Sequence, residues 1–160
     1  GGDSSMVLAY LRARAAAGGI PADLLLVNCG LHDIKTDPQT GVRQIPRDAY
    51  AANLEAIVDT AEAMGLPLVW ICTTPCDERV HNRHRTNFHR FAADCNAYNE
   101  TADAILARRG VPSIDLHAFT LNCSDESARY CDHVHFQIPV REQQAAFIAG
   151  WLEANSELRM

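Results

Sequence analysis

Short, nearly continuous apolar runs alternate along the chain with longer stretches in which apolar residues recur every three to four positions. The apolar runs lie at residues 23–29, 67–74 and 111–116. Each is too short for a typical helix, and unbroken hydrophobicity is typical of a strand that is covered on both faces. Helical spacing occupies the segments around these runs, at residues 5–17, 54–61, 91–105 and 140–152.

This alternation predicts one α/β domain over residues 1–160, with a parallel sheet between two layers of helices (a three-layer α/β/α fold). No repeat or linker divides the chain. Three strands are few for such a sheet, and no strand leads into the helix at 5–17. We therefore expect the first strands of the fold to be missing from this chain. The sheet edge that they would cover favours self-association into a homo-oligomer.

The composition is that of a globular protein, with 48% apolar and 21% charged residues. A net charge of -6 argues against nucleic acid or an anionic membrane surface as the main partner. No run reaches the ~20 apolar residues of a membrane span. No signal peptide is visible, which favours a cytoplasmic location.

None of the six cysteines forms a Cys-x-x-Cys pair, and a chain of this length needs no disulfide framework. Cys29 and Cys72 lie in apolar runs, which predicts that both are small core residues. Cys123 and Cys131 flank a loop and could pair under oxidising conditions.

Candidate chemistry gathers where ligands bind in an open parallel sheet, outside the carboxyl ends of the strands. Three segments follow the three predicted strands: "NCGLHDIK" at 28–35, "TTPCDERVHNRHRTNFH" at 73–89 and "YCDHVHF" at 130–136. The leading "GGDSS" begins a helix and is expected at the same edge. The convergence of all four segments favours a functional site there.

The clearest pair within these segments is Asp132 and His135, which are three residues apart. On a tight turn Asp132 could accept the Nδ1–H of His135 and leave Nε2 free to take a proton from a hydroxyl nucleophile. The spacing alone is equally compatible with a surface pair that has no catalytic task. His133 is a competing candidate, although its offset from Asp132 suits the pairing less well.

The segment "GLHD" places Gly30 in a sharp turn and His32 at the sheet edge. A ring N–H of His32 could stabilise a developing oxyanion. Asp33 is expected to bind backbone amides and shape the loop rather than to react. Taken alone, the segment also fits an ordinary turn from strand to loop.

Together these residues resemble the SGNH or GDSL-type hydrolases, lipase- and esterase-like enzymes with a flavodoxin-like sheet. "DLLLVNCGLHD" is similar to the family's strand followed by Gly-x-Asn-Asp, and "DHVHF" to its Asp-x-x-His block. "LVWICTTP" is similar to the strand and Thr-Pro step between them. The resemblance implies a serine esterase that cleaves small carboxylic esters through an acyl-enzyme and needs no metal or organic cofactor.

The resemblance also assigns roles. His135 would be the general base and Asp132 its orienting carboxylate. His32 stands where the family has an asparagine that donates to the oxyanion, a role that a histidine ring N–H can also perform. Gly2 would supply a backbone N–H to the same oxyanion hole.

The role of "GGDSS" depends on counting elements. The family places a helix, a strand and another helix between its nucleophile block and Gly-x-Asn-Asp, whereas only one helix separates "GDS" from residues 23–29. Gly2 therefore matches the family's oxyanion glycine, and the nucleophile is expected upstream of this chain. Asp3 or Ser4 would then cap the helix. The alternative is that Ser4 is the nucleophile of a shortened variant.

The segment at 73–89 is rich in arginine and histidine. Its simplest interpretation is a solvated basic loop, and a sharper one is that Arg79, His81 and Arg83 rim the site and favour an anionic or heavily hydroxylated substrate. The histidines from His81 to His89 fit no strong metal-ligand spacing. Two alternatives to the esterase remain open: a non-catalytic binding domain with this fold, and a metal-dependent hydrolase that uses these histidines.

Overall fold

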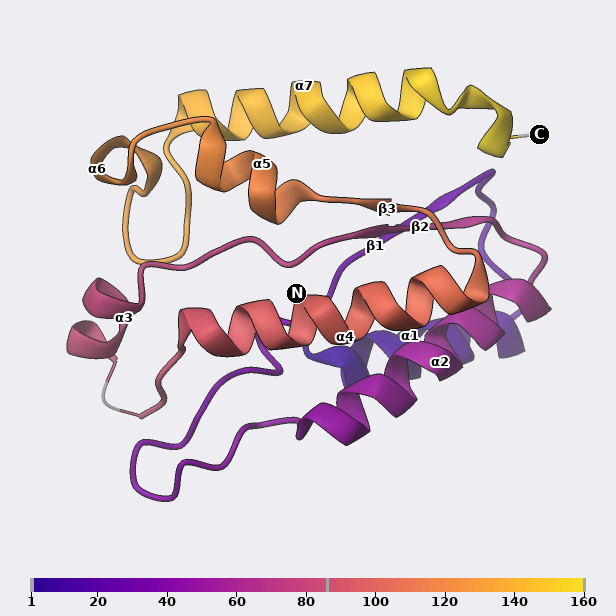
Figure 1. The fold of residues 1–160 in the computed structure, drawn as a ribbon. Coiled ribbons are helices and arrows are strands. Elements are labelled where there is room, and N and C mark those ends of the chain that lie inside the picture. The colour runs from indigo at the N-terminus through magenta and orange to yellow at the C-terminus, as the bar shows by residue number, and fades with distance from the viewer. Residues whose placement is uncertain (1, 86, 160) are drawn as a thin grey trace.

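The computed structural model describes residues 2–85 and 87–159, and its centre is a parallel three-stranded sheet (Figure 1). The strand order is β1-β2-β3, and all neighbours are parallel. Leu25 pairs with Leu68, and Trp70 pairs with Ser113. The strands are β1 (Leu25–Val27), β2 (Leu68–Ile71) and β3 (Ser113–Ile114).

Helices lie on both faces of the sheet (Figure 1). One face carries α1 (Ser4–Ala16), α2 (Arg47–Ala63) and α4 (Ala92–Arg109). The other carries α5 (Leu116–Asn122) and α7 (Ile138–Ala154). The shorter helices are α3 (Glu78–His84), α6 (Glu126–Arg129) and the 3₁₀ turn Ser156–Arg159.

The predicted α/β class and parallel sheet are confirmed, and the three strands lie inside the three apolar runs. The expectation of a plain loop at 73–89 is wrong, because α3 forms within it. Asp77 caps this helix by accepting the amide of Val80 at 2.9 Å. The segment after β3 likewise contains α5 and α6, with Asp115 accepting the amide of Ala118 at 2.9 Å. Side-chain caps thus stabilise the starts of α3 and α5, two short helices that apolar periodicity does not reveal, whereas α6 has no such cap among the described residues.

The first helix begins at Ser4, with Asp3 as its N-cap. Asp3 Oδ1 accepts the amide of Met6 at 3.0 Å, which satisfies one of the unpaired N–H groups at the helix start. Of the two capping residues considered from the sequence, Asp3 is the one that caps, and Ser4 is already helical.

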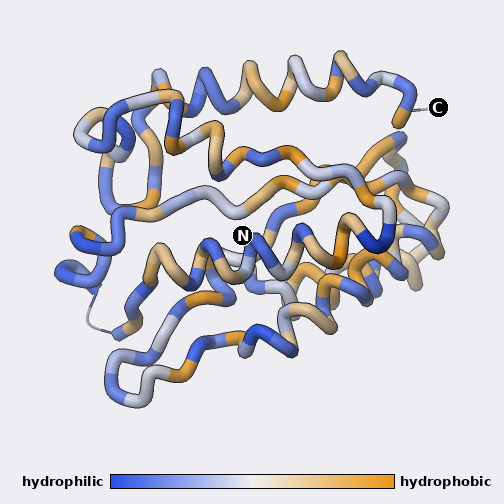
Figure 2. Tube along the Cα trace, in the orientation of Figure 1, coloured by the Kyte–Doolittle hydropathy of each residue, from blue (hydrophilic) through white to orange (hydrophobic). Residues whose placement is uncertain are grey.

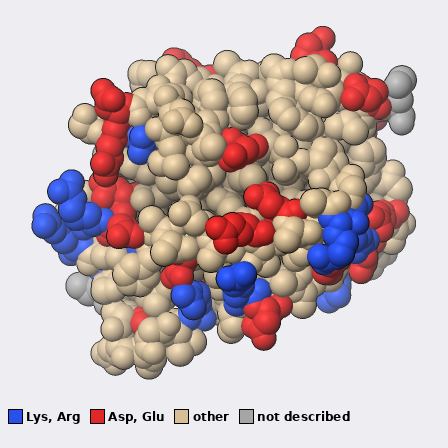
Figure 3. All heavy atoms as spheres, in the orientation of Figure 1, with Lys and Arg blue, Asp and Glu red and all other residues tan. Residues whose placement is uncertain are grey.

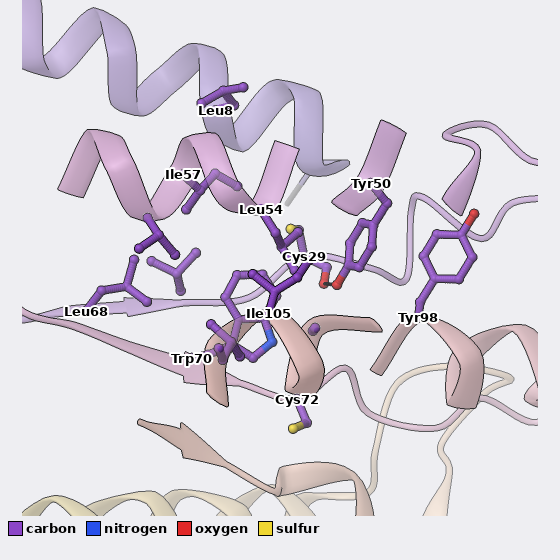
Figure 4. Packing of buried hydrophobic residues seen from close by; sticks show 14 of the residues in the cluster. Leu8, Cys29, Tyr50, Leu54, Ile57, Leu68, Trp70, Cys72, Tyr98 and Ile105 are labelled. Atoms are coloured by element: carbon purple, nitrogen blue, oxygen red, sulfur yellow. Dashed lines mark hydrogen bonds between the residues drawn. The ribbon is translucent and has the colours of Figure 1, made fainter. Parts of the chain in front are cut away.

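The core lies between the sheet and the layer of α1, α2 and α4 (Figure 4). Trp70 of β2 packs there with Leu54 of α2, and both are almost completely buried. The rings of Tyr50 and Tyr98 join the core with centroids 4.8 Å apart. Apolar positions follow the strands and recur along the helices, while many of the turns are polar (Figure 2).

The predicted core cysteines, Cys29 and Cys72, are buried. Cys123 and Cys131 are free thiols, so the possible pairing of these two is not present. Among the described residues, no helix combines the length and the hydrophobicity that crossing a bilayer requires.

We predict that Leu54→Ala lowers the free energy of unfolding by about 2–5 kcal/mol, because it removes a fully buried side chain and leaves a cavity. Urea unfolding followed by circular dichroism measures the loss. Leu121→Ala is the matched control, since Leu121 is 43% exposed and should cost less than about 1 kcal/mol. Equal losses in the two variants would contradict this assignment of the core.

Candidate active site

A network of buried hydrogen bonds fastens the carboxyl ends of β1 and β2 to α4. Thr73 donates its hydroxyl to the carbonyl of Cys29 at 2.9 Å. The side chain of Asn99 on α4 both accepts the amide of Thr73 and donates to its carbonyl, each at 2.9 Å. The polar backbone at the end of the strands is thereby satisfied without water, which makes this edge a rigid base for a site.

Gly30 makes the sharp turn that was predicted after β1. Its φ of +145° lies in a region that other residues rarely adopt. A Cβ at this position would lie 2.2 Å from Oγ1 of Thr73, too close for any side chain. The chain can therefore leave the strand and place residues 31–33 at the edge only because residue 30 is glycine.

Asp33 is completely buried and holds the start of α1, as expected of a residue that binds backbone amides. Its two carboxylate oxygens accept the amide of Ser4 at 2.9 and 3.1 Å. Burial raises the pKa of Asp33, and the hydrogen bonds from Ser4 oppose that rise. This contact joins the start of α1, two residues after Gly2, to the residue that follows His32, so the two residues predicted to form the oxyanion hole belong to directly bonded segments.

Ser4 is also completely buried, and its hydroxyl accepts a hydrogen bond from Asn53 Nδ2 at 2.9 Å. No hydrogen bond joins its hydroxyl to His135 among the described residues. The structure therefore does not join Ser4, the alternative nucleophile, to the predicted base by a hydrogen bond among the described residues. Gly2 lies close to the helix, since a Cβ there would be 2.9 Å from Cβ of Met6.

The environment of His32 favours a neutral ring. Partial burial lowers the pKa of His32, and the nearby cations Lys35 and Arg90 lower it further, while Asp3 opposes them. A neutral imidazole carries one ring N–H, which is the donor that an oxyanion contact needs.

Asp132 and His135 form the pair that the spacing predicts. Oδ2 of Asp132 lies 2.6 Å from Nδ1 of His135, and Oδ1 accepts the amides of Val134 and His135 at 2.7 and 2.8 Å. Partial burial raises the pKa of Asp132, but these hydrogen bonds outweigh it and hold the pKa below its usual range. The carboxylate accepts the Nδ1–H, so Nε2 of a neutral His135 is an acceptor on a side chain that is 76% exposed.

Main-chain contacts hold the turn that carries this pair. Tyr130 and Phe136 form an antiparallel bridge, and the amide of Cys131 donates to the carbonyl of His135 at 2.8 Å. The amide of Asp77, at the start of α3, donates to the carbonyl of His133 at 3.0 Å. The position of the Asp132–His135 pair therefore depends on α3 as well as on its own turn.

His81 does not lie on the substrate rim where the sequence predicted it. It is completely buried, and its Nδ1 lies 2.9 Å from Nδ1 of His133. This is the second contact between His133 and the α3 segment. Because one of these nitrogens must donate and the other accept, at least one of the two rings is neutral. Burial lowers the pKa of His81 to about 4, with Arg90 and His133 contributing.

Arg90 connects the two halves of the site. Its Nε donates to the carbonyl of Leu31 at 2.7 Å, beside His32. Its backbone amide and carbonyl both bond the side chain of Asn82 on α3, each at 2.9 Å. Arg90 could not be singled out from the sequence, because nothing in the spacing distinguishes it from the other arginines between residues 79 and 90.

Two open hollows flank the turn at 130–136. One, of about 630 Å³, is lined by Arg79, His117, Tyr130 and their neighbours, and the other, of about 520 Å³, by Arg85, Asp132 and His133. Arg79 lines the larger hollow, as a residue at the rim of a site would. Arg83, which was predicted to lie at the same rim, lines neither hollow and is exposed on α3. Basic side chains gather over the α3 end of the molecule in Figure 3. No group of three or more possible metal ligands occurs among residues 2–85 and 87–159.

The sequence pattern of the GDSL-like lipase/acylhydrolase family matches residues 1–137. The chain belongs to this family. The match includes "DHVHF" and the edge that carries Gly2 and His32, so the family pattern and the geometric site cover the same residues. No curated protein matches the chain.

Solved structures of similar fold include several hydrolases. A GDSL-like lipase from Bacteroides thetaiotaomicron superposes with a TM-score of 0.72 at 15% identity, covering 96% of this chain and 72% of that one. A lipase/acylhydrolase from Enterococcus faecalis superposes with a TM-score of 0.65 at 21% identity, covering 83% of this chain and 62% of that one. A catalytic mutant of an acetylxylan esterase from Geobacillus stearothermophilus superposes with a TM-score of 0.63 at 16% identity, covering 88% of this chain and 65% of that one. At these identities the likeness shows a shared fold.

The buried histidine gives this member of the GDSL-like family a predicted sensitivity to acid. An unfolded histidine has a pKa of about 6.5, whereas the pKa of His81 in the folded protein is lowered to about 4. As the pH falls through this window, the unfolded chain binds a proton that the folded protein does not, so stability falls with pH. We expect urea unfolding to show a smaller loss between pH 7 and pH 5 in His81→Gln than in the wild type.

His84→Gln is the matched control, because His84 lies on the same helix with an exposed side chain. It should keep the wild-type pH dependence. His133 has a lowered pKa too, so His81→Gln should reduce the dependence and not abolish it. An unchanged slope in His81→Gln would contradict the assignment.

Proposed function

We propose that the chain carries the base, the orienting carboxylate and the oxyanion donors of a serine esterase that acts through an acyl-enzyme. The observation that carries this proposal is the 2.6 Å contact between Asp132 Oδ2 and His135 Nδ1, on a turn where Nε2 is left as an acceptor. A histidine oriented in this way is the general base of hydroxyl nucleophiles in unrelated hydrolases. Membership of the GDSL-like family supports ester hydrolysis as the reaction.

In the proposed reaction, a serine Oγ attacks the ester carbonyl carbon while its proton passes to Nε2 of His135. Asp132 stabilises the imidazolium that forms, and the N–H groups of Gly2 and His32 stabilise the oxyanion of the tetrahedral intermediate. Collapse of the intermediate breaks the C–O bond, and the leaving alcohol takes the proton from His135. Water then attacks the acyl-enzyme with the same base, releasing the acid and restoring the serine.

The attacking serine is proposed to be a residue other than Ser4. The hydroxyl of Ser4 is buried against Asn53, and its amide is bound by Asp33, which suits a residue at a helix start. A serine encoded ahead of Gly1 fits the proposal, because Gly2 then has the place of the family's oxyanion glycine. The ester that is cleaved is proposed as a small molecule.

Replacing the base should remove most of the activity. We predict that, in the encoded protein that includes the upstream serine, His135→Ala lowers kcat for 4-nitrophenyl acetate by about a hundredfold to ten-thousandfold, the range for loss of a general base. Asp132→Asn should lower kcat as well, because an amide cannot orient and stabilise the ring in the same way. Release of 4-nitrophenol measures both.

His84→Ala is the control for these variants, since it removes an exposed histidine from α3. It should retain wild-type turnover. Undiminished hydrolysis in His135→Ala would overturn the proposal. Absence of turnover in the wild type with a serine encoded upstream would favour the non-catalytic binding domain.

A fluorophosphonate probe tests the nucleophile directly, because it labels activated serines covalently. We predict that peptide mass spectrometry finds no label on Ser4 and finds label on a serine upstream of Gly1 when the encoded protein contains one. Label on Ser4 that disappears in His135→Ala would overturn the assignment and make Ser4 the nucleophile.

A further inference from the structure

Two histidine rings meet beside the turn of the Asp132–His135 pair through nitrogens of the same kind. Nδ1 of His81 on α3 lies 2.9 Å from Nδ1 of His133, and the ring centroids are 4.7 Å apart in an edge-to-face arrangement. Such a contact is a hydrogen bond only if one of the two nitrogens carries a proton and the other does not. The direction of this bond therefore fixes where each ring carries its proton.

The surroundings of His81 favour the direction in which its Nδ1 donates. Its other ring nitrogen, Nε2, is sealed from solvent and has no hydrogen-bond partner within residues 2–85 and 87–159. If Nδ1 accepted instead, the proton of a neutral ring would be on Nε2, as a buried N–H without an acceptor. Orphaned buried N–H groups are rare in proteins, because each keeps the full cost of losing its water.

Both rings are neutral at pH 8, so each has a single proton to place. Burial lowers the pKa of His81 to about 4, and the charges of Arg90 and His133 contribute. Burial also lowers the pKa of His133, although the charge of Asp132 opposes that effect. With Nδ1 of His81 as the donor, Nδ1 of His133 is the acceptor, and the single proton of His133 is on Nε2.

The contact with His81 turns His133 toward α3 instead of toward Asp132. Asp132 and His133 are adjacent in the chain and line the same open hollow of about 520 Å³. The hydrogen bonds of the Asp132 carboxylate among the described residues nevertheless come from Val134 and His135. His81 binds Nδ1 of His133, whereas Asp132 binds Nδ1 of His135. The two histidines of the turn therefore have different partners.

We infer that His81 is a positioning residue of the proposed esterase: it donates to Nδ1 of His133, holds the His133 proton on Nε2 and thereby leaves Asp132 to His135. The inference deepens the proposed function and rests on it for its link to catalysis. The positions of the ring protons, however, exist without turnover and can be measured separately.

This arrangement also removes His133 as an alternative base. A general base needs a ring nitrogen with a free lone pair. In His133 that lone pair is on Nδ1 and is bound by His81, while Nε2 carries the proton. In His135 the proton is on Nδ1 against Asp132, so the lone pair of Nε2 is free.

Long-range ¹H–¹⁵N correlation spectra of the histidine rings, recorded on the full chain at pH 8, locate these protons directly. We expect His133 to be protonated on Nε2 alone, and His81 and His135 on Nδ1 alone. A nitrogen–nitrogen coupling across the hydrogen bond should join the Nδ1 atoms of His81 and His133. A proton on Nδ1 of His133, or a ring that averages between both forms, would overturn the inference.

Kinetics test the positioning role, in the encoded protein that includes the upstream serine. His81→Leu should lower kcat for 4-nitrophenyl acetate by about tenfold to a hundredfold with little change in KM, because a displaced base affects the reacting geometry and not substrate binding. His81→Asn is the matched variant, since asparagine has the branched shape of leucine and adds an amide N–H that can donate to His133. It should restore most of the lost turnover. Equal losses in the two variants would leave His81 a packing role alone and overturn the inference.

A second substitution tests whether His81 acts through His133. Adding His133→Ala to His81→Leu removes the ring that is free to compete for Asp132, so part of the lost kcat should return. The main-chain hydrogen bond from Asp77 to the carbonyl of residue 133 does not depend on that ring. A double variant no faster than His81→Leu would contradict competition for Asp132 and overturn the positioning role.

The spectra separate this inference from the esterase. If His81→Leu does not fold, the proton positions in the wild type still decide the direction of the bond. The expected proton positions without hydrolysis in the encoded protein would count against the esterase alone. Hydrolysis together with a proton on Nδ1 of His133 would count against the role of His81 alone.

Discussion

The hydrogen bond from Thr73 to the carbonyl of Cys29 is the contact on which the rest of the site depends. It joins the ends of β1 and β2, and Asn99 adds α4 to the same point. The close approach leaves no room for a side chain at residue 30, so only glycine can stand where the chain turns toward Asp33. From that turn Asp33 reaches the amide of Ser4 and sets the start of α1 at the sheet edge. One polar contact therefore determines where the oxyanion candidates lie.

The Asp132–His135 pair is held by a different set of contacts, and α3 joins the two sets. The amide of Asp77 and the ring of His81 both bind His133, which stands between Asp132 and His135 in the chain. On the other side of α3, the side chain of Asn82 holds the backbone of Arg90. The turn of Asp132 and His135 and the backbone at Arg90 thus share one short helix as their support.

Several features could be predicted from the sequence because they depend on neighbouring residues. The apolar runs placed all three strands, and the spacing of Asp132 and His135 placed a hydrogen bond that lies within one turn. The helix α3 was not predicted, since six of its seven residues are polar or charged and show no apolar period, and its cap is a single side chain, Asp77. Two expectations from the sequence stay predictions: that the first strands of the fold are missing from this chain, and that the nucleophile lies upstream of it.

By itself, the sequence determined the α/β class, the order of the strands and long helices, and the pairing within "DHVHF". Each of these follows from local periodicity or from the reach of one side chain along its own turn. Only the tertiary structure decided that Ser4 is buried against Asn53, that His81 binds His133 instead of facing solvent, and that Arg90 lies beside Leu31. Those outcomes depend on which distant segments pack together, and burial and charge compensation are properties of that packing, not of residue spacing.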